Sequence, residues 1–440
     1  MTKKYDLVVV GGGPAGLMAA RTAGENGLKT ALLERKTDIT KVRRVDGSVL
    51  SPVNEYTFGE ILTFSPKAKR IGFPVSGFSV RYDGPYQNMF GFVIHSPGGK
   101  TFSFGDRKKL KMDPERNRKG IAIDKELLLK GLLEDVQAIG VDIFPGTNVT
   151  GIDKRESGVV VTGNGEQFEG SFVIAADGIN SRLAQLTGIN KERTFYGTHV
   201  QRLWYLEDIE IPEIEGIDFI ITMYGTFYVV STCYKGHYHV GTTSYYAQED
   251  LNASLTKLVY EDEVYSPWFK GVKKAGECSC VINLLSPMKQ PFKDNVLFVG
   301  DATWVMEATN AAAILFGWKA ANAVTLAILD GKINKEGISS YLDWWEKTCY
   351  EPYGRTEFKP IHPSDFLTSD DMDYLVSLIK EPLLPTMDFF KLFGTIGNAF
   401  GELFPVIQEE RPDIMDKIMD VANRMEELEK KARKAGFPNR

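Results

Sequence analysis

The sequence predicts an α/β protein in which a parallel, Rossmann-type sheet with helices and a small antiparallel meander is interleaved with an antiparallel-sheet domain and followed by C-terminal helices. Three observations lead to this prediction. The chain opens with a strand, a glycine-rich turn, a helix and a second strand. Two later apolar strands each end at an acidic residue. Two other long stretches are rich in aromatic and β-branched residues, which is typical of antiparallel sheets.

The opening unit is a strand–turn–helix–strand pattern. Leu7–Val10 is a continuous apolar run, as expected of a parallel strand that is covered on both faces. The turn Gly11–Gly16 follows, then a helix over Leu17–Asn26 and a second strand over Thr30–Glu34. Later, residues 149–175 predict short antiparallel strands with a turn at 163–165.

The turn is a dinucleotide-binding fingerprint of the form G-x-G-x-x-G, and its candidate residues are Gly11, Gly13, Pro14, Ala15 and Gly16. The first glycine permits the tight turn, the second lets a pyrophosphate approach the backbone, and the third packs the helix on the strand. The N–H groups at the helix N-terminus would hold the phosphate charge. Glu34, with Arg35 beside it, closes the second strand 18 residues after the last glycine, where its carboxylate can bind ribose hydroxyls. This unit does not by itself separate NAD from FAD.

Two further motifs each place an acidic residue at the end of an apolar strand. The first ends at Asp177-Gly178, and Ser181-Arg182 follows shortly after. The second ends at Gly300-Asp301. Taken singly, each is equally well explained as a turn that terminates a strand.

In this order, the three motifs resemble the FAD-binding set of the p-hydroxybenzoate-hydroxylase-like flavoproteins. Within that superfamily the chain resembles the geranylgeranyl-reductase-like family through two stretches. Val42–Gly47 sits where family members have a V-R-C-x-E-G type segment, and Gly300–Ile314 matches G-D-A-A-G-x-x-x-P-x-x-G-G-G-I without a gap. The resemblance covers roughly residues 1–350 and is specific for the cofactor domain. It implies FAD as the cofactor, with Asp177-Gly178 near the pyrophosphate, Gly300-Asp301 at the ribitol and pyrophosphate, and the next helix pointing at the flavin ring.

The departures from the family pattern limit what the resemblance carries over. Arg44 stands at the cysteine position, Ala308 at the proline position, and Ala311, Ala312 and Ala313 replace the glycine triplet. Alanine keeps a helical N-terminus if none of these residues needs a positive φ, so the helix dipole can still face the flavin. The family's Y-x-W-x-F-P-type strand is missing, and residues 227–231 lie in its place. An isoprenoid substrate is therefore not carried over from the resemblance alone.

Several side chains are candidates for chemistry, each with a plainer alternative. Glu307 lies just before the flavin-facing helix and is a candidate proton donor, the alternative being a solvated or helix-capping glutamate. Arg44, with its neighbour Arg43, would flank the pyrophosphate or an anionic substrate, or form a solvated basic patch. His237 and His239 share one face of a probable strand and are predicted to be structural surface residues. Cys278 and Cys280 also share a face and are predicted to be packed thiols.

The aromatic stretches 73–104 and 195–246 admit two interpretations. Each aromatic residue is most simply a part of the sheet core, but together they could wall an apolar pocket. The stretch Phe389–Phe404 is predicted to pack on the body of the protein, in preference to a partner or a membrane surface.

Composition excludes several classes of protein. The 440 residues include 52 Lys and Arg against 58 Asp and Glu, so the net charge of −6 does not favour nucleic-acid binding. The four cysteines form no C-x-x-C pair, which argues against a zinc ribbon, an iron–sulfur cluster or a disulfide framework, and we expect no metal. Few cysteines and no apolar leader at the N-terminus predict a cytoplasmic protein. The long apolar stretch 308–329 contains Asn and Lys and is predicted to be a buried helix.

The predicted domains are interleaved. Residues 1–72, 105–190 and 285–350 would form the FAD-binding domain, 73–104 and 191–284 the substrate domain, and 351–440 the helical region. The predicted function is an FAD-dependent oxidoreductase that reduces or desaturates a carbon–carbon bond of an apolar or aromatic substrate by hydride transfer at flavin N5. NAD(P)H or a protein would donate the electrons. The alternative is an aromatic monooxygenase that uses NAD(P)H and oxygen.

Overall fold

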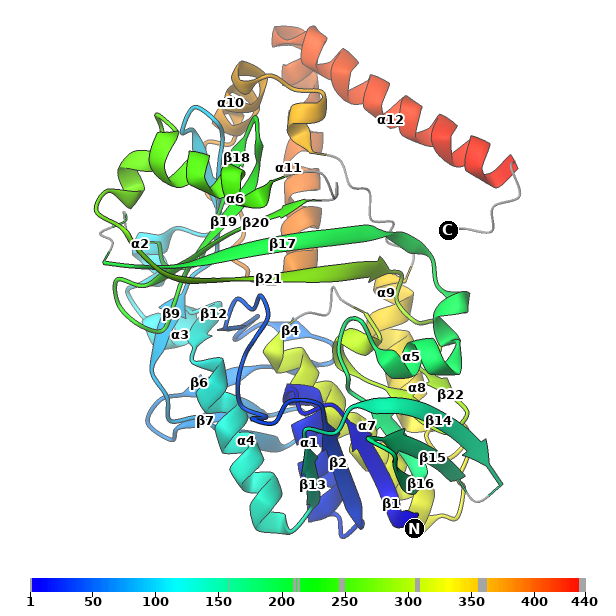
Figure 1. The fold of residues 1–440 in the computed structure, drawn as a ribbon. Helices are drawn as coiled ribbons and strands as arrows, with labels where there is room; N and C mark the ends of the chain where they lie inside the picture. Colours follow the sequence, from blue (N-terminus) through cyan, green and yellow to red (C-terminus); the bar gives the residue numbers. More distant parts are fainter. Residues whose placement is uncertain are drawn as a thin grey trace.

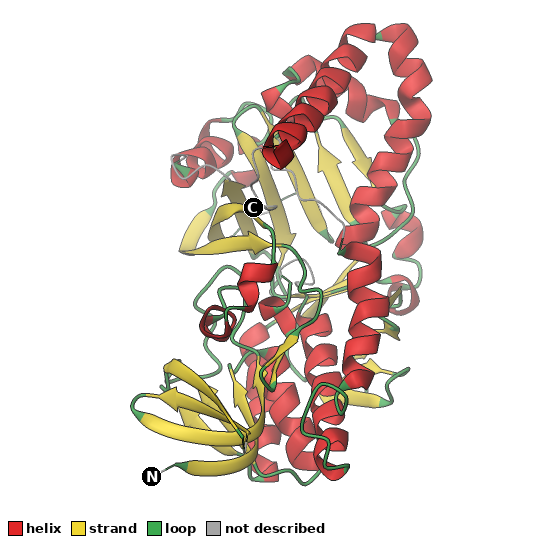
Figure 2. Cartoon of the chain, turned by 90° about the vertical axis from the view of Figure 1, so that its right-hand side faces the viewer, coloured by secondary structure: helices red, strands yellow, loops and turns green. Residues whose placement is uncertain are grey.

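The computed structural model of the chain describes residues 2–156, 158–208, 211, 214–244, 250–304, 309–354 and 362–434. Figure 1 shows a mixed sheet with helices at the N-terminal end of the molecule and a second, antiparallel sheet stacked above it. The C-terminal helices lie at the opposite end from the N-terminus, as the turned view in Figure 2 also shows.

The first sheet is built on a parallel core. The strand order is β13-β2-β1-β16-β15-β14. β23 also pairs with β16, along the part of β16 that β15 does not cover. β13, β2, β1, β16 and β23 run parallel, whereas β14 and β15 form an antiparallel meander on β16. The predicted parallel sheet with a small meander is therefore confirmed. Its strands are β1 Lys3–Val10, β2 Thr30–Glu34, β13 Asp142–Pro145, β14 Val149–Arg155, β15 Gly158–Gly163, β16 Glu166–Ala175, β22 Phe292–Lys293 and β23 Val296–Phe298.

Helices cover this sheet because its strands are apolar on both faces. α1, α4, α7 and α8 pack in one large core cluster, and α5 packs in a second cluster across the sheet. The start of α4 is set by Asp124, whose side chain accepts the Leu127 N–H, and its end by Gly140 in the left-handed conformation. The helices are α1 Pro14–Glu25, α4 Lys125–Ile139, α5 Arg182–Thr187, α7 Asn310–Leu329 and α8 Ser339–Trp345.

Among the residues that the structure describes, α7 is the one helix long and apolar enough to cross a membrane, but 61% of its apolar window is buried inside the protein. It packs directly on α1. A Cβ atom added at Gly317 would lie 2.1 Å from the carbonyl oxygen of Ala15, so the two helix backbones touch. The prediction of a buried helix is confirmed, because packing on α1 explains its apolar composition.

The second sheet has seven strands in the order β11-β10-β18-β19-β20-β17-β21. All neighbours are antiparallel except β10 and β18. One face is covered by α6 and the short helical turns η2 and η3. The strands and helices are β10 Phe92–His95, β11 Thr101–Ser103, β17 Phe195–Glu207, β18 Ile217–Thr222, β19 Gly225–Ser231, β20 Tyr238–Ser244, β21 Lys273–Leu285, α6 Leu251–Thr256, η2 Lys257–Glu261 and η3 Ser266–Phe269.

The opposite face of this sheet, called the inner face below, carries Tyr205, Tyr228, His239 and Cys278. Tyr205 pairs directly with His239, and Tyr228 with Gly241, so these side chains project to the same side. Tyr228 lies flat across β20, because a Cβ at Gly241 would come within 2.2 Å of its ring. The inner face therefore presents polar groups at its β17–β21 side.

Small sheets and helices join the two large sheets. The residues are β3 Val49–Leu50, β4 Tyr56–Thr57, β5 Glu60–Ile61, β6 Thr63–Ser65, β7 Arg70–Phe73, β8 Phe78–Arg81, β9 Tyr86–Met89, β12 Gly120–Ile123, α2 Arg107–Leu110 and α3 Pro114–Asn117. The seven-stranded sheet takes its strands from residues 92–103 and 195–285. The domain boundaries proposed from the sequence stay a prediction.

The C-terminal region is helical, with α9 Glu351–Tyr353, α10 Ser369–Leu378, α11 Phe389–Glu410 and α12 Pro412–Lys434. Phe389 and Leu392 of α11 pack against apolar residues of the inner face. Phe393 and Phe404 point outward instead, with 58% and 40% of their surface exposed. The stretch predicted to pack on the body therefore does so along one side of α11 only.

Candidate functional site: three cofactor loops and an inner-face cavity

The glycine turn before α1 has the geometry that a pyrophosphate needs. Gly11 has φ +107°, and a Cβ there would lie 2.2 Å from the carbonyl oxygen of Ala176. A Cβ at Gly16 would lie 1.8 Å from the carbonyl oxygen of Gly11. At Gly13, in contrast, a Cβ would meet nothing within 4 Å, and no side chain caps α1, which begins with Pro14. The first-turn N–H groups therefore face open space, and the turn fits a phosphate group.

Glu34 is buried beside this turn. Its Oε2 accepts the N–H of Gly12 at 2.6 Å, and its Oε1 accepts the N–H of Lys36 at 2.8 Å. The carboxylate of Glu34 therefore supports the backbone of the glycine turn. Each oxygen has a second lone pair, so ribose binding by Glu34 stays a prediction. The neighbouring Arg35 is exposed.

The second loop follows β16. Asp177 accepts hydrogen bonds from Ser181 Oγ at 2.6 Å and from the N–H of Leu183 at 3.0 Å, and so fixes the start of α5. Burial raises the pKa of its carboxyl group despite these donors. Gly178 follows with φ +82°. Its Cβ position lies 3.6 Å from a guanidinium nitrogen of Arg44, so the second loop meets the segment 42–47.

The third loop follows β23 as the helical turn η4, Gly300–Ala302. Gly300 has φ +62°, and a Cβ there would lie 3.3 Å from Cβ of Ala15 in α1. Asp301 Oδ2 accepts a hydrogen bond from Arg44 Nη2 at 2.6 Å. All three predicted cofactor loops therefore converge, and Arg44 lies between the second and the third.

Arg193 supports the third loop, and the sequence did not reveal this contact. Its guanidinium donates to the carbonyl oxygens of Ser286 at 2.6 Å, Thr303 at 2.9 Å and Ala302 at 3.4 Å. Burial lowers its pKa to about 10. Arg193 thus holds the turn that carries Asp301. No motif surrounds it in the sequence, and its bonds join segments about 100 residues apart.

The start of α7 agrees with the predicted use of alanine. None of Ala311, Ala312 and Ala313 has a positive φ, and Thr309 caps the helix by accepting the N–H of Ala312 at 3.1 Å. Glu307, the candidate proton donor, lies outside the described residues. Before that gap, Trp304 is buried and stacks on Phe390 of α11 with ring centroids 4.9 Å apart.

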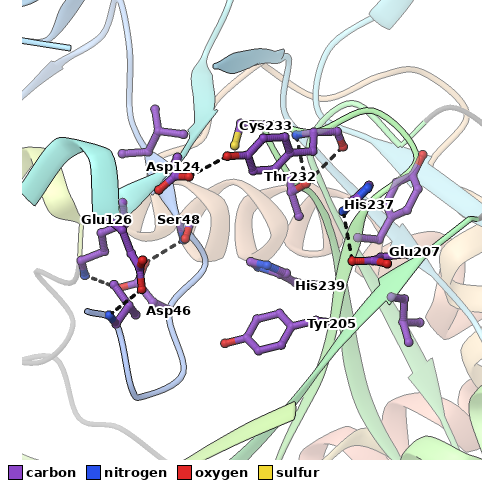
Figure 3. A pocket seen from close by; sticks show the side chains of 16 residues that line it. Asp46, Ser48, Asp124, Glu126, Tyr205, Glu207, Thr232, Cys233, His237 and His239 are labelled. Carbon is purple, nitrogen blue, oxygen red and sulfur yellow. Dashed lines mark hydrogen bonds and ion pairs between the residues drawn. The ribbon is translucent and has the colours of Figure 1, made fainter. Parts of the chain in front are cut away.

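Beyond the loops, a cavity of about 340 Å³ separates the inner face from the segment 42–48 and the start of α4 (Figure 3). Its acidic groups already have partners. Asp46 pairs with Lys125, Asp124 accepts the hydroxyl of Tyr234, and Glu126 accepts Lys41 Nζ at 2.5 Å. The lining residues include Val42, Asp46, Ser48, Asp124, Lys125, Glu126, Tyr205, Glu207, Thr232, Cys233, Tyr234, His237 and His239.

The two histidines and two cysteines singled out in the sequence lie in different surroundings. His237 and His239 both line the cavity, so the histidine pair predicted to be structural lies at a candidate site. Cys278 Sγ lies 3.0 Å from the hydroxyl of Tyr205, whereas Cys280 Sγ lies 3.5 Å from Gln201 Oε1. The segment that carries Arg44 also reaches Cys280. The cavity and the cofactor loops therefore share one wall.

Together, these features define an FAD-dependent oxidoreductase, and comparison with known proteins supports this class. The family described as pyridine nucleotide-disulphide oxidoreductase matches residues 5–201. The digeranylgeranylglycerophospholipid reductase of Methanococcus vannielii is 25% identical over 378 residues, which are 80% of this chain and 84% of that protein.

Solved structures show the same fold. A geranylgeranyl bacteriochlorophyll reductase-like protein from Thermoplasma acidophilum superposes with a TM-score of 0.69 at 20% identity, covering 94% of this chain and all of that one. The p-nitrophenol 4-monooxygenase of Pseudomonas putida superposes less well, with a TM-score of 0.57 at 16% identity over 85% of this chain and 94% of that one. The chain is an FAD-dependent flavoprotein, and its predicted resemblance to the geranylgeranyl-reductase-like proteins is confirmed.

Proposed function

We propose that this protein uses bound FAD to saturate carbon–carbon double bonds in an apolar, isoprenoid-like lipid. The observation that carries the proposal is the layout of the inner face. Polar groups such as Tyr205 line a cavity together with segment 42–48, whose Arg44 meets two of the cofactor loops, and an apolar cluster lies farther along the same face. Tyr228 belongs to that cluster and also lies close to Cys278 and Cys280. The face therefore suits a long apolar chain with its reactive bond near the loops.

Within this proposal, the first and third loops have defined tasks. The glycine turn and the N-terminus of α1 would hold the pyrophosphate, and Glu34 the ribose. Asp301, held by Arg193 through its turn, would contact the ribitol. Reduced FAD supplies a hydride when it is bound. The residues of the inner face orient the substrate, exclude water and provide the proton that saturation also requires.

The names of the relatives support the substrate class. Reductases of digeranylgeranylglycerophospholipids match most of the chain, and the monooxygenase neighbour is structurally more distant. We propose NAD(P)H or a protein as the electron donor. The sequence contains no second G-x-G-x-x-G turn, so a separate nicotinamide domain is not part of the proposal.

The test is a single-turnover experiment without oxygen. The FAD-loaded protein is reduced with dithionite, and an unsaturated isoprenoid alcohol is added while the flavin absorption is followed. Reoxidation with a product that gains two hydrogens per double bond supports the proposal. In a parallel run with oxygen and a phenol, reoxidation that yields a hydroxylated aromatic product, with no reoxidation in the oxygen-free run, would instead establish the monooxygenase alternative.

A further inference from the structure

Three side chains form a polar group on the inner face at the cavity. Tyr205 and His239 are direct cross-strand partners, with ring centroids 5.0 Å apart in an edge-to-face arrangement. Cys278 of the neighbouring strand lies 3.0 Å from the Tyr205 hydroxyl. Figure 3 shows the Tyr205 and His239 rings side by side, with the Tyr205 hydroxyl on the side of the cavity where Asp46 lies.

One atom of this group lacks the partner that burial demands. His239 Nδ1 is buried, and no hydrogen-bonding group among the described residues reaches it. Buried polar atoms in proteins almost always have a partner, and a missing one indicates a ligand or an ordered water. His239 lines the cavity, so a polar group of a ligand in the cavity could supply the bond.

The pKa shifts of these three side chains determine where the group carries its protons. Burial raises the pKa of the Tyr205 hydroxyl, and the nearby Cys278, Asp46 and Glu126 raise it further. Burial also raises the pKa of the Cys278 thiol and lowers that of His239 to about 4. At neutral pH the hydroxyl and the thiol therefore both carry their protons, and the imidazole is uncharged.

Three of the carboxylates at the cavity and the nearby arginine already have partners. Asp46 pairs with Lys125, Asp124 accepts a hydroxyl hydrogen bond, and Glu126 accepts two donors, so each of these carboxylates already has a hydrogen-bond partner. Arg44 pairs with Asp301, and an arginine does not release its proton at neutral pH.

We propose that Tyr205 is the catalytic proton donor of the reductase reaction, and that Cys278 is a positioning residue that holds its hydroxyl oxygen. This inference rests on the function proposed above. The 3.0 Å contact fits either atom as donor; in the proposed arrangement the thiol S–H donates to the tyrosine oxygen, which leaves the O–H directed into the cavity. His239 binds a polar group of the substrate.

The reaction balances as follows. The double bond gains a hydride at one carbon, supplied by the reduced cofactor, and the Tyr205 proton at the other. The substrate thereby gains two electrons and two hydrogens, and the cofactor is oxidised. Water that enters the cavity restores the proton to the tyrosinate. A two-electron donor of the nicotinamide type, or a protein donor, reduces the cofactor again.

The first experiment uses the protein without substrate. Alkylation of Cys278 by iodoacetamide is followed by peptide mass spectrometry as a function of pH, in the wild type and in Tyr205→Phe. Loss of the hydroxyl removes the hydrogen-bond partner of the thiol, so we expect the pH profile of Cys278 to shift while that of Cys233 does not. Identical Cys278 profiles would overturn the Tyr205–Cys278 pair.

The second experiment measures the reaction itself with the dithionite-reduced, FAD-loaded protein and the isoprenoid alcohol. We expect Tyr205→Phe to slow reoxidation by about 100-fold or more, because a general acid contributes about 10²–10⁴-fold. Cys278→Ser, which keeps a donor, should retain most of the rate.

The matched control is Tyr260→Phe, because Tyr260 is 54% exposed and lies against Trp204 on the opposite face of the sheet. FAD affinity and the unfolding midpoint of each variant show that it folds. A wild-type rate in Tyr205→Phe would overturn the inference alone. Absence of any reoxidation in the wild type would overturn the proposed function, and with it the role of Tyr205.

Discussion

The contact between α1 and α7 gives the sharpest stability prediction. Gly317→Ala adds one methyl group to a helix interior, where alanine is otherwise favoured over glycine by about 0.8–1.0 kcal/mol. That methyl carbon would lie 2.1 Å from the carbonyl oxygen of Ala15, whereas an ordinary contact begins at 3.4 Å. The helices would have to separate by roughly 1.3 Å at this point, the difference between these two distances.

Separation is resisted because both helices belong to one buried cluster on the same sheet. Overpacking of this kind costs about 1–3 kcal/mol and sometimes more, which outweighs the gain in helix propensity. We expect Gly317→Ala to lower the free energy of unfolding by about 2 kcal/mol in urea titrations. FAD affinity should fall as well, because α1 begins at the glycine turn.

The matched control is Gly397→Ala in α11. A Cβ there would meet nothing within 4 Å, so only helix propensity acts, and we expect a gain of about 0.5–1 kcal/mol. Opposite signs for the two variants would support the reasoning. A Gly317→Ala protein as stable as the wild type would show that the helices can move apart freely, and would refute it.

Three further predictions follow from the same geometry. Gly13→Ala should leave the unfolding midpoint of the FAD-free protein unchanged but weaken FAD binding in calorimetry by about tenfold or more, since each 1.4 kcal/mol is a factor of ten and the methyl group occupies the phosphate approach. Arg193→Met should lower stability by about 1–3 kcal/mol in urea, because it leaves several carbonyl oxygens without a donor. Asp371 is buried, which would raise its pKa, but donors including Lys417 and Arg411 lower it. Its stabilising effect is therefore present above about pH 4 and lost as the pH falls below that value, so α12 should become sensitive to protease in acid; in Asp371→Asn it should be sensitive already at pH 7.

The cofactor loops could be predicted because their chemistry is local. Gly11 and Gly16 are fixed by the path of one tight turn, and Asp177 and Asp301 by the ends of two strands, so spacing in the sequence is enough. Their convergence follows from the parallel order of the strands, since the carboxyl ends of parallel strands lie at one edge.

The inner-face group could not be found in this way. Tyr205 and Cys278 lie 73 residues apart and meet only through the register of β17 and β21. In that register Tyr205 pairs with Gly276 and Leu203 with Cys278. The sequence alone does not fix which residues of the two strands face each other. Arg193 was missed for a related reason, because its partners are carbonyl oxygens that no residue pattern marks.

The ring stack at Trp304 ties the C-terminal region to the cofactor turn. Trp304 lies two residues beyond η4 and packs on Phe390, which in turn stacks on Tyr353 at 4.1 Å. A chain shortened before α11 would leave this indole open to water. Tryptophan emission shifts to longer wavelengths when the ring becomes hydrated. The emission wavelength of Trp304 therefore reports whether α11 is packed against it.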